Sequence, residues 1–160
     1  MRPLVWVARC STKRRAPSRL LAESAWLLTV NNHGDYRSQQ LVYLNAGHEN
    51  PSMVRANGTL ERLETSGPIL GIFKAARYTT KTTAFQTQDV LNTFTDGVVD
   101  ARSNSGESFG IDRVQALLST PTASANNPEQ LLSATLDALK EHCQEADQFD
   151  DTTLLIMKAL

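Results

Sequence analysis

Three short segments of the sequence combine carboxylate, histidine and glycine residues that could do chemistry. Their sequences are Asn-Ala-Gly-His at 45–48, Thr-Asp-Gly-Val at 95–98 and Asp-Asp-Thr-Thr at 150–153. In the last two, a carboxylate stands at the end of an apolar run or at the start of one, where a strand would hold it firmly. Carboxylate oxygens are the ligands that hard cations such as Mg²⁺ and Mn²⁺ prefer. Two such ions can activate water and neutralise a phosphoryl group, so these segments suggest metal-assisted hydrolysis.

Each segment alone also has an ordinary structural explanation. A Thr-Asp-Gly sequence is more often a turn than a metal site, and an Asp-Asp pair before a strand is usually a solvated cap or an edge guard. His48 is more often a packed loop histidine than a ligand, and neither His33 nor His142 stands at ligand-like spacing from it. The chemical interpretation therefore depends on the combination of the three segments and on their order.

Short strands are predicted to position these segments. Apolar residues that alternate or cluster predict strands over 26–30, 41–46 and 152–157. Asn57-Gly58 lies between two apolar-alternating arms and predicts a hairpin over 52–62, because Asn-Gly is the strongest short hairpin signal. The threonine-rich stretch 77–85 and the apolar stretch 90–95 predict a second hairpin that turns over 86–89.

Helices are predicted late in the chain. Residues 112–119 form a short amphipathic pattern, and Asn127-Pro128-Glu129 supplies an N-cap, a first-turn proline and a first-turn acid. The second helix is expected to run to about His142 and to bury one face. The residues expected on that face are Leu131, Leu132, Leu136 and Leu139. Strands first and helices at one end predict an α+β domain with largely antiparallel sheets.

The composition excludes several classes of protein. The 160 residues weigh 17.6 kDa, and 16 Lys and Arg against 17 Asp and Glu leave a net charge of −1. This balance argues against nucleic acid or an anionic membrane as a partner, and no apolar run approaches the roughly 20 residues that a membrane helix needs. Cys10 and Cys143 form no Cys-x-x-Cys pair. Their number and separation argue against a disulfide framework or structural zinc and favour a reducing, cytoplasmic location.

The basic residues gather at the N-terminal end. Arginines and lysines, but no acids, precede Glu23. Such a segment could be a transit peptide or a nucleic-acid arm, but the plainest interpretation is a poorly packed leader without an address. We therefore expect residues 1–22 to be a basic leader with no recognisable fold, and residues 23–160 to form the domain.

The order of the three segments, with further short motifs between them, resembles the metal-dependent serine/threonine phosphatases of type 2C, in their SpoIIE-like bacterial branch. The resemblance covers about residues 41–157. Its motifs are, in order, Leu-Val-Tyr-Leu-Asn-Ala-Gly-His at 41–48, Asn-Gly at 57–58, Gly-Pro-Ile-Leu-Gly-Ile at 67–72, Phe-Thr-Asp-Gly-Val-Val-Asp-Ala at 94–101, Ser-Phe-Gly at 108–110 and Phe-Asp-Asp-Thr-Thr-Leu-Leu at 149–155.

This resemblance implies a fold, a metal centre and an activity. The fold would be an antiparallel β-sandwich flanked by helices. The activity would be hydrolysis of phosphoserine or phosphothreonine on a regulatory partner protein, commonly of the anti-anti-sigma type. Two Mn²⁺ or Mg²⁺ ions are expected for the family, with metal-bound water rather than a side chain as the nucleophile. The resemblance assigns Asp96 and Asp150 to the metal, with Asp151 as a further candidate. The supporting positions that it implies are Asn45, Gly47, His48 and Gly97.

One part of the family pattern is not found in this sequence. The family's domain begins with Asp-x-Ser-Gly-x-Gly, whose aspartate bridges both metals, whereas the only Asp-Gly here is Asp96-Gly97. We therefore expect a partial domain that lacks the N-terminal strands and first helices. Without a bridging carboxylate, we expect one weakly bound metal ion or none.

Three interpretations stay open. The chain is a phosphatase, a catalytically deficient truncated homologue that acts as a protein-binding module, or a fragment of a longer regulator that has lost an upstream sensor or receiver domain. Missing helices would also leave an apolar sheet face uncovered. We therefore expect either a homo-oligomer or a leader packed across that sheet through residues 4–7, Leu-Val-Trp-Val.

Overall fold

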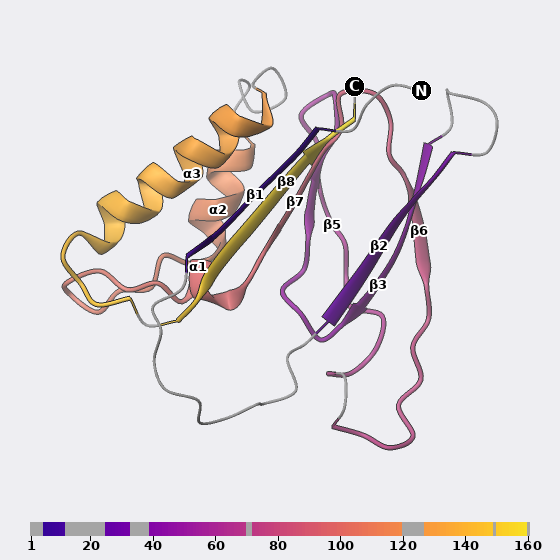
Figure 1. Cartoon of the computed structure of the whole chain (residues 1–160), viewed down its shortest axis with the longest axis horizontal. Helices are drawn as coiled ribbons and strands as arrows, with labels where there is room; N and C mark the ends of the chain where they lie inside the picture. Colours follow the sequence, from indigo (N-terminus) through magenta and orange to yellow (C-terminus); the bar gives the residue numbers. More distant parts are fainter. Residues whose placement is uncertain are drawn as a thin grey trace.

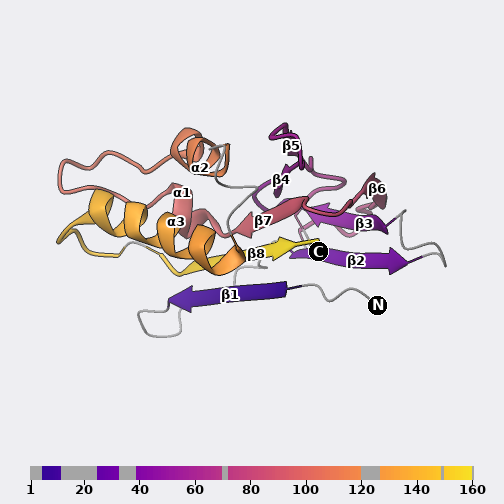
Figure 2. The same ribbon diagram turned by 90° about the horizontal axis from the view of Figure 1, so that it is seen from above.

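The computed structural model describes residues 5–11, 25–32, 39–69, 72–119, 127–148 and 150–159, with side chains described from Gln40 onward. Figures 1 and 2 show three layers: helices, a five-stranded sheet and a three-stranded sheet. The strands are β1 (Val5–Ser11), β2 (Ala25–Asn32), β3 (Gln39–Ala46), β4 (Ser52–Val54), β5 (Leu60–Arg62), β6 (Lys81–Ala84), β7 (Val90–Phe94) and β8 (Thr152–Lys158). The helices are α1 (Asp96–Val99), α2 (Ile111–Leu118) and α3 (Pro128–Cys143).

The two sheets are antiparallel throughout their strand pairings. The larger sheet has the order β1-β8-β7-β4-β5, and the smaller one has the order β2-β3-β6. Helices α2 and α3 lie on the outer side of the larger sheet (Figure 2). The predicted α+β architecture with an antiparallel sandwich is therefore confirmed.

Two hydrophobic clusters hold the layers together. Side chains of β7 point alternately to its two faces, so this strand contributes to both clusters. Phe94 packs with the buried residues of α2 and α3, whereas Leu91 packs with residues of the smaller sheet. The helix-side cluster also contains Leu154, and the cluster between the sheets contains Phe85 and Met157. Because successive strand residues point to opposite faces, β7 is buried on both sides and forms the centre of the domain.

The hairpin of β4 and β5 forms where the Asn-Gly signal predicts it. Val54 is the register partner of Leu60, and the Gly58 N–H donates to the Arg55 carbonyl at 2.8 Å. Gly58 alone takes the left-handed backbone conformation in this turn, with φ +83°, while Asn57 does not. The turn is therefore a longer loop with a glycine at the bulge position rather than a two-residue turn.

The second predicted hairpin is wrong, although both of its strands exist. β6 pairs with β3 in the smaller sheet, whereas β7 pairs with β4 and β8 in the larger one. The connection over 85–89 crosses between the sheets, with Gln88 in the left-handed region at φ +72°. The physical reason is burial. Every residue of β7 is buried, which suits a central strand with neighbours on both edges. Residues of β6 alternate between partly buried and exposed, which suits the edge of the smaller sheet.

Helix α3 begins where its capping signal predicts. The Asn127 side chain accepts a hydrogen bond from the Gln130 N–H at 2.8 Å, and the Gln130 side chain accepts one from the Asn127 N–H at 3.2 Å. This reciprocal pair is a capping box, and Pro128 occupies the first helical turn.

The buried face of α3 differs from the prediction at one position. Leu131, Leu132 and Leu139 are buried as predicted, but Leu136 is only partly buried and Thr135 is 1% exposed. The Thr135 hydroxyl donates to the Leu131 carbonyl at 2.9 Å, so its burial leaves no unpaired polar group. Leu136 instead lies at the edge of the buried stripe and lines a hollow of about 280 Å³ between α3 and α1.

Part of the predicted leader forms a strand. The backbone of Val5–Ser11 pairs antiparallel with β8, from Val5 opposite Lys158 to Ser11 opposite Thr152. This strand satisfies the backbone groups along the edge of β8. The prediction of no recognisable fold before residue 23 therefore does not hold for residues 5–11. It also extends the sheet at its edge instead of lying across a sheet face, while Leu4 lies outside the described residues. The expected self-association stays a prediction.

A polar pair lies buried in the larger sheet. Ser52 and Asn92 are register partners in β4 and β7, and both are fully buried. Within the described part of the chain, neither the Ser52 hydroxyl nor either polar atom of the Asn92 amide has a hydrogen-bond partner. An unpaired buried amide opposes folding, because its hydrogen bonds to water are lost without replacement.

Replacing Asn92 by leucine, which has a similar branched shape, is therefore expected to stabilise the fold. The expected gain in free energy of unfolding is roughly 1–3 kcal/mol, the desolvation cost of the unpaired group. Urea denaturation measures it as a higher midpoint with an unchanged slope. A lower midpoint would show that the amide has a hydrogen-bonding role in the folded state.

Candidate metal and catalytic site

Hydrogen bonds through threonine join the end of β7 to the start of β8. The Thr95 N–H donates to the Thr153 carbonyl at 3.1 Å, and the Thr95 hydroxyl donates to the Asp151 carbonyl at 3.0 Å. The same hydroxyl accepts from the Thr153 N–H at 2.9 Å. These bonds bring two segments more than fifty residues apart in sequence into register, so Asp96 follows directly after the junction that carries Asp150 and Asp151.

Gly97 allows the closest approach between the two segments. A Cβ atom at this position would lie 2.3 Å from the Asp151 carbonyl oxygen and 2.8 Å from its carbonyl carbon. The Thr152 hydroxyl also donates to the Gly97 carbonyl at 3.2 Å. Glycine is required here because the backbones touch, and its φ is not in the left-handed region.

Asp96 is the first residue of α1 rather than the last residue of a strand. Its Oδ1 accepts a hydrogen bond from the Gly97 N–H at 3.0 Å, and the Asp150 Oδ1 accepts one from the Asp151 N–H at 2.7 Å. Asp96, Asp150 and Asp151 are all exposed. Among the residues that the structure describes, no lysine or arginine pairs with any of these three carboxylates.

The oxygen donors at this junction are of the chemical type that a hard divalent cation prefers. They are carboxylate oxygens from two segments held side by side, and Mg²⁺ and Mn²⁺ prefer such ligands. The described residues include no group of three or more metal-ligating side chains. β1 ends beside the start of β8, with Ser11 opposite Thr152, and its sequence Val-Trp-Val-Ala-Arg-Cys-Ser holds no acid. The donors present therefore fit one ion better than a bridged pair.

The Asn-Ala-Gly-His segment forms a loop built around Asn45. This asparagine is fully buried, accepts a hydrogen bond from the His48 N–H at 2.8 Å and donates to the His48 carbonyl at 3.1 Å. Gly47 has φ +81°, and a Cβ there would lie 2.9 Å from the Ile69 backbone. His48 is half-buried in this loop. In Figure 1 the loop, at the end of β3, and the junction of α1 with β8 lie at the same lower end of the molecule.

Three hydroxyl residues near these segments were not identified from the sequence. Ser66 exchanges hydrogen bonds with the Asn45 backbone, accepting its N–H at 2.9 Å through the side chain and donating its own N–H to the carbonyl at 2.9 Å. Thr95 and Thr152 bind the two acidic segments together, as described above. Thr95 and Thr152 could have been singled out from the sequence, because each stands directly beside an acidic residue of the candidate site.

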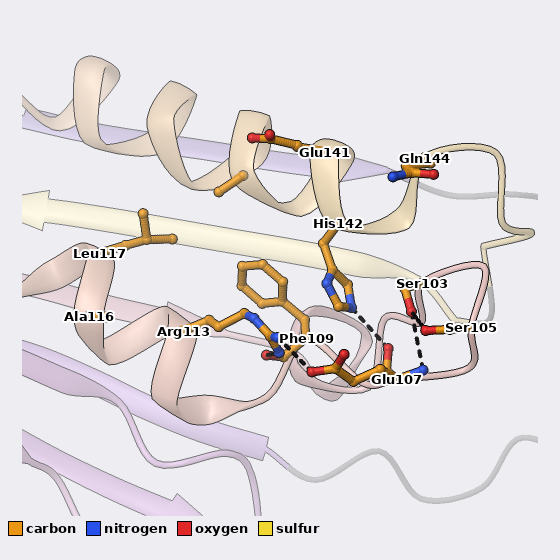
Figure 3. Close-up of a pocket in the computed structure, with 11 residues that line it drawn as sticks. Ser103, Ser105, Glu107, Phe109, Arg113, Ala116, Leu117, Glu141, His142 and Gln144 are labelled. Atoms are coloured by element: carbon orange, nitrogen blue, oxygen red, sulfur yellow. Dashed lines mark hydrogen bonds and ion pairs between the residues drawn. The ribbon is translucent and has the colours of Figure 1, made fainter.

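A separate hollow of about 750 Å³ lies between α2, α3 and the loop over 103–109 (Figure 3). Its apolar wall includes Phe109 and Leu117, and its rim carries an ion pair between Glu107 and Arg113 at 2.6 Å. His142 Nε2 lies 2.9 Å from the Glu107 carbonyl, and its ring meets Phe109 edge-on at a centroid distance of 5.4 Å. None of the three acidic metal candidates lines this hollow.

The Glu107–Arg113 pair predicts a pH dependence of stability. The hydrogen bond and charge of Arg113 lower the pKa of the Glu107 carboxyl below its ordinary value of 4.5. A carboxyl whose pKa is lowered by folding adds stability above its unfolded pKa and loses that contribution as the pH falls through the folded value. Glu107→Gln is therefore expected to be slightly less stable than the wild type at neutral pH and equal to it in acid. The difference is small because the pair is exposed. Urea titrations of both proteins at neutral and at acid pH measure this difference in stability. A difference that is the same at both pH values would contradict the prediction.

None of the helices in the described part of the chain is both long enough and apolar enough to cross a membrane.

Comparison with known proteins identifies a family and a fold. The family model for Stage II sporulation protein E (SpoIIE) matches residues 22–160. Protein IcfG of a Synechocystis species is 33% identical over 121 residues, which cover 76% of this chain and 19% of that protein. The chain thus spans about a fifth of the length of this curated relative.

Solved phosphatase domains have the same fold. The SiaA-PP2C domain of Pseudomonas aeruginosa superposes with a TM-score of 0.63 at 20% identity, covering 74% of this chain and 46% of that one. The RsbU and RsbW domains of Rv1364c from Mycobacterium tuberculosis superpose with a TM-score of 0.60 at 24% identity, covering 76% of this chain and 34% of that one.

Proposed function

The chain belongs to the SpoIIE family, and from this premise we propose that it is a metal-dependent protein serine/threonine phosphatase domain. Its family and its fold are those of PP2C-type phosphatase domains that act in signalling regulation. The proposed reaction is hydrolysis of phosphoserine or phosphothreonine on a regulatory partner protein in the cytoplasm, with a partner of the anti-anti-sigma type as the first candidate.

The observation that supports this proposal is that the segment beginning at Asp96 lies against the segment that carries Asp150 and Asp151. Threonine hydrogen bonds and the contact of Gly97 with the Asp151 backbone hold the acidic segments together. We assign Asp96 and Asp150 to one Mn²⁺ or Mg²⁺ ion, with Asp151 as a further ligand candidate. Such an ion, when bound, supplies positive charge against phosphoryl oxygens and makes a water molecule more acidic.

The remaining residues of the site have positioning roles in this proposal. Thr95 and Thr152 fix the distance between the acidic segments through their hydroxyl groups. The loop built on Asn45, with Gly47 and His48, supports the same end of the sandwich. Because the three carboxylates are exposed, a phosphorylated side chain on the surface of another protein can reach them.

A second candidate function is a protein-binding module without turnover. The observation in its favour is the number of carboxylates: among the described residues, two acidic segments meet at the junction, and β1, which ends there, holds no acid. Two carboxylate segments hold a second ion poorly, and a two-ion centre is what stabilises both the attacking and the leaving oxygen. A chain that binds one ion and a phosphoprotein without hydrolysing it would fit this observation.

Calorimetric titration with MnCl₂ tests the metal assignment. Asp96→Asn is expected to weaken Mn²⁺ binding by at least about tenfold, since loss of even a supporting group costs 10–100-fold. Asp112→Asn is the matched control, because Asp112 is an exposed first-turn aspartate on α2 and is not among the ligand candidates. Unchanged affinity in Asp96→Asn, or no Mn²⁺ binding by the wild type, would contradict the assignment.

A phosphate-release assay separates the two candidate functions. Mn²⁺-dependent release from a phosphoserine peptide, lost in Asp96→Asn, would support the phosphatase. Mn²⁺-dependent binding of the same peptide without release would support the binding module.

A further inference from the structure

The loop between β5 and β6 exposes large apolar side chains. Ile69, Ile72 and Phe73 are 39%, 58% and 61% exposed, and they are the exposed large hydrophobic residues of the described chain. Such side chains normally pack away from water. Single exposed apolar residues are common, but a group of them in one loop is typical of an interaction site. We call these three residues, together with Lys74 and Arg77, the docking tip.

The docking tip is also cationic. Lys74 and Arg77 are exposed beside the apolar residues, and the sequence from Thr65 to Gln88 contains no acid. The next cation, Lys81, lies 3.9 Å from Glu64, which belongs to the preceding segment. A surface of one charge sign attracts partners of the opposite sign and directs their approach. The tip therefore favours a partner surface that combines acidic and apolar groups.

The base of this loop is held in place, so its apolar exposure does not result from loose packing. The Thr79 N–H donates to the Ser66 carbonyl at 3.2 Å, and the Ser66 N–H donates to the Asn45 carbonyl at 2.9 Å. A Cβ on Gly67 would lie 2.4 Å from the Tyr78 ring, which shows how closely the two arms of the loop pack.

The loop is also connected to the candidate site. The Ile69 backbone touches Gly47, so the tip begins against the Asn-Ala-Gly-His loop. In Figure 1 the described part of the segment between β5 and β6 extends beyond the lower end of the sandwich, the end at which β7 leads into α1 and β8 begins. A protein presenting a phosphorylated side chain to Asp96 and Asp150 would approach from this end.

We propose that the docking tip binds the phosphoprotein partner through an acidic, apolar surface next to its phosphorylated residue. This inference rests on the proposed function, because it takes Asp96 and Asp150 as the place where the phosphate binds. Phe73 and Ile72 would supply the apolar contact, and Lys74 and Arg77 would direct the approach of the acidic surface. Aromatic anchors and basic side chains commonly dominate such contacts.

Fluorescence anisotropy tests the proposal with the full chain and Mn²⁺. The probe is a fluorescein-labelled phosphoserine peptide flanked by leucines and glutamates, and a second probe replaces the glutamates by lysines. The wild type is expected to bind the acidic probe more tightly. The double variant Ile72→Ser, Phe73→Ser is expected to lose about tenfold or more in affinity for it. Lys74→Glu with Arg77→Glu is expected to lose a similar factor and most of the salt dependence.

Control measurements separate docking from folding and from the metal site. Lys140→Glu inverts an exposed charge on α3 and is expected to bind the acidic probe as the wild type does. Circular dichroism checks that every variant is folded. Unchanged affinity of both tip variants would overturn the proposal, and so would equal losses for the acidic and the basic probe.

The unphosphorylated acidic peptide separates this inference from the proposed function. If the tip variants weaken binding of both peptides while Asp96→Asn affects neither, docking is supported and the proposed function fails. If Asp96→Asn weakens the phosphopeptide while the tip variants do not, the proposed function is supported and docking is overturned. A second copy of the chain or a lipid surface could occupy the tip instead. The proposal would be overturned if the tip variants kept the wild-type affinity for the peptide but lost dimerisation in sedimentation velocity or lost binding to phosphatidylserine vesicles.

Discussion

Asp89→Ala is expected to lower the free energy of unfolding by about 3–5 kcal/mol, because it removes the buried carboxylate of an ion pair and leaves the largely buried Arg55 with only the more exposed Glu61 as a charged partner. Asp89 is 2% exposed, and its Oδ2 lies 2.8 Å from Arg55 Nη1. The same carboxylate accepts hydrogen bonds from the Ala56 N–H at 3.1 Å and the Gln86 N–H at 2.9 Å. Alanine would remove one charge and the acceptor of three hydrogen bonds.

Arg55 explains why this one carboxylate matters to the whole sandwich. Its guanidinium also pairs with Glu61 and donates to the Thr83 hydroxyl at 2.8 Å, so it joins the β4–β5 hairpin to β6 of the other sheet. Burial alone would lower the pKa of Arg55, but its hydrogen bonds to Asp89 and Glu61 more than compensate, and the pKa is raised. The network therefore holds the sheets together through the β6–β7 crossover, where Asp89 sits.

Urea denaturation followed by circular dichroism measures this effect. Glu64→Gln is the matched control, because it removes a carboxylate that is 78% exposed and 3.9 Å from Lys81. Such an exposed pair contributes at most about 1 kcal/mol. A loss of the same small size in Asp89→Ala would show that the Arg55 network contributes little to the fold.

The sequence predicted those elements whose ends are marked by local backbone chemistry. The Asn57-Gly58 turn and the Asn127 cap each satisfy backbone groups within a few residues, so the pattern alone identifies them. The β6–β7 crossover could not be predicted in this way. The two strands are adjacent in sequence, but β7 lies between β4 and β8 in its sheet, with the helices on one face and the smaller sheet on the other. No local signal reveals those distant partners.

At the candidate site, too, local motifs could be predicted from the sequence, whereas contacts that depend on the packed fold could not. The resemblance and the order of the motifs predicted that Asp96 and Asp150 would be neighbours across the chain, and their roles as metal ligands stay a prediction. The sequence did not show that Thr95 forms the junction through its hydroxyl, because that depends on the register between β7 and β8. The apolar exposure of Phe73 was equally hidden, since exposure is a property of the packed fold.

Gly97→Ala is expected to lower the free energy of unfolding by about 1–3 kcal/mol and to weaken Mn²⁺ binding at least about tenfold. A methyl group at this position would lie 2.3 Å from the Asp151 carbonyl oxygen, a backbone atom that cannot move away without shifting the start of β8. Relief of the clash has to separate Asp96 from Asp150, which is why stability and metal affinity are expected to fall together.

Gly58→Ala separates the two effects. Gly58 has φ +83° and open space around its Cβ position, so alanine there costs about 1–2 kcal/mol of backbone strain without any clash. Its turn joins β4 to β5, so Mn²⁺ affinity is expected to stay at the wild-type value while stability falls. Calorimetric titration and urea denaturation of both variants give the comparison. Equal Mn²⁺ affinities in the two variants would mean that the close contact between Gly97 and Asp151 does not position the metal ligands.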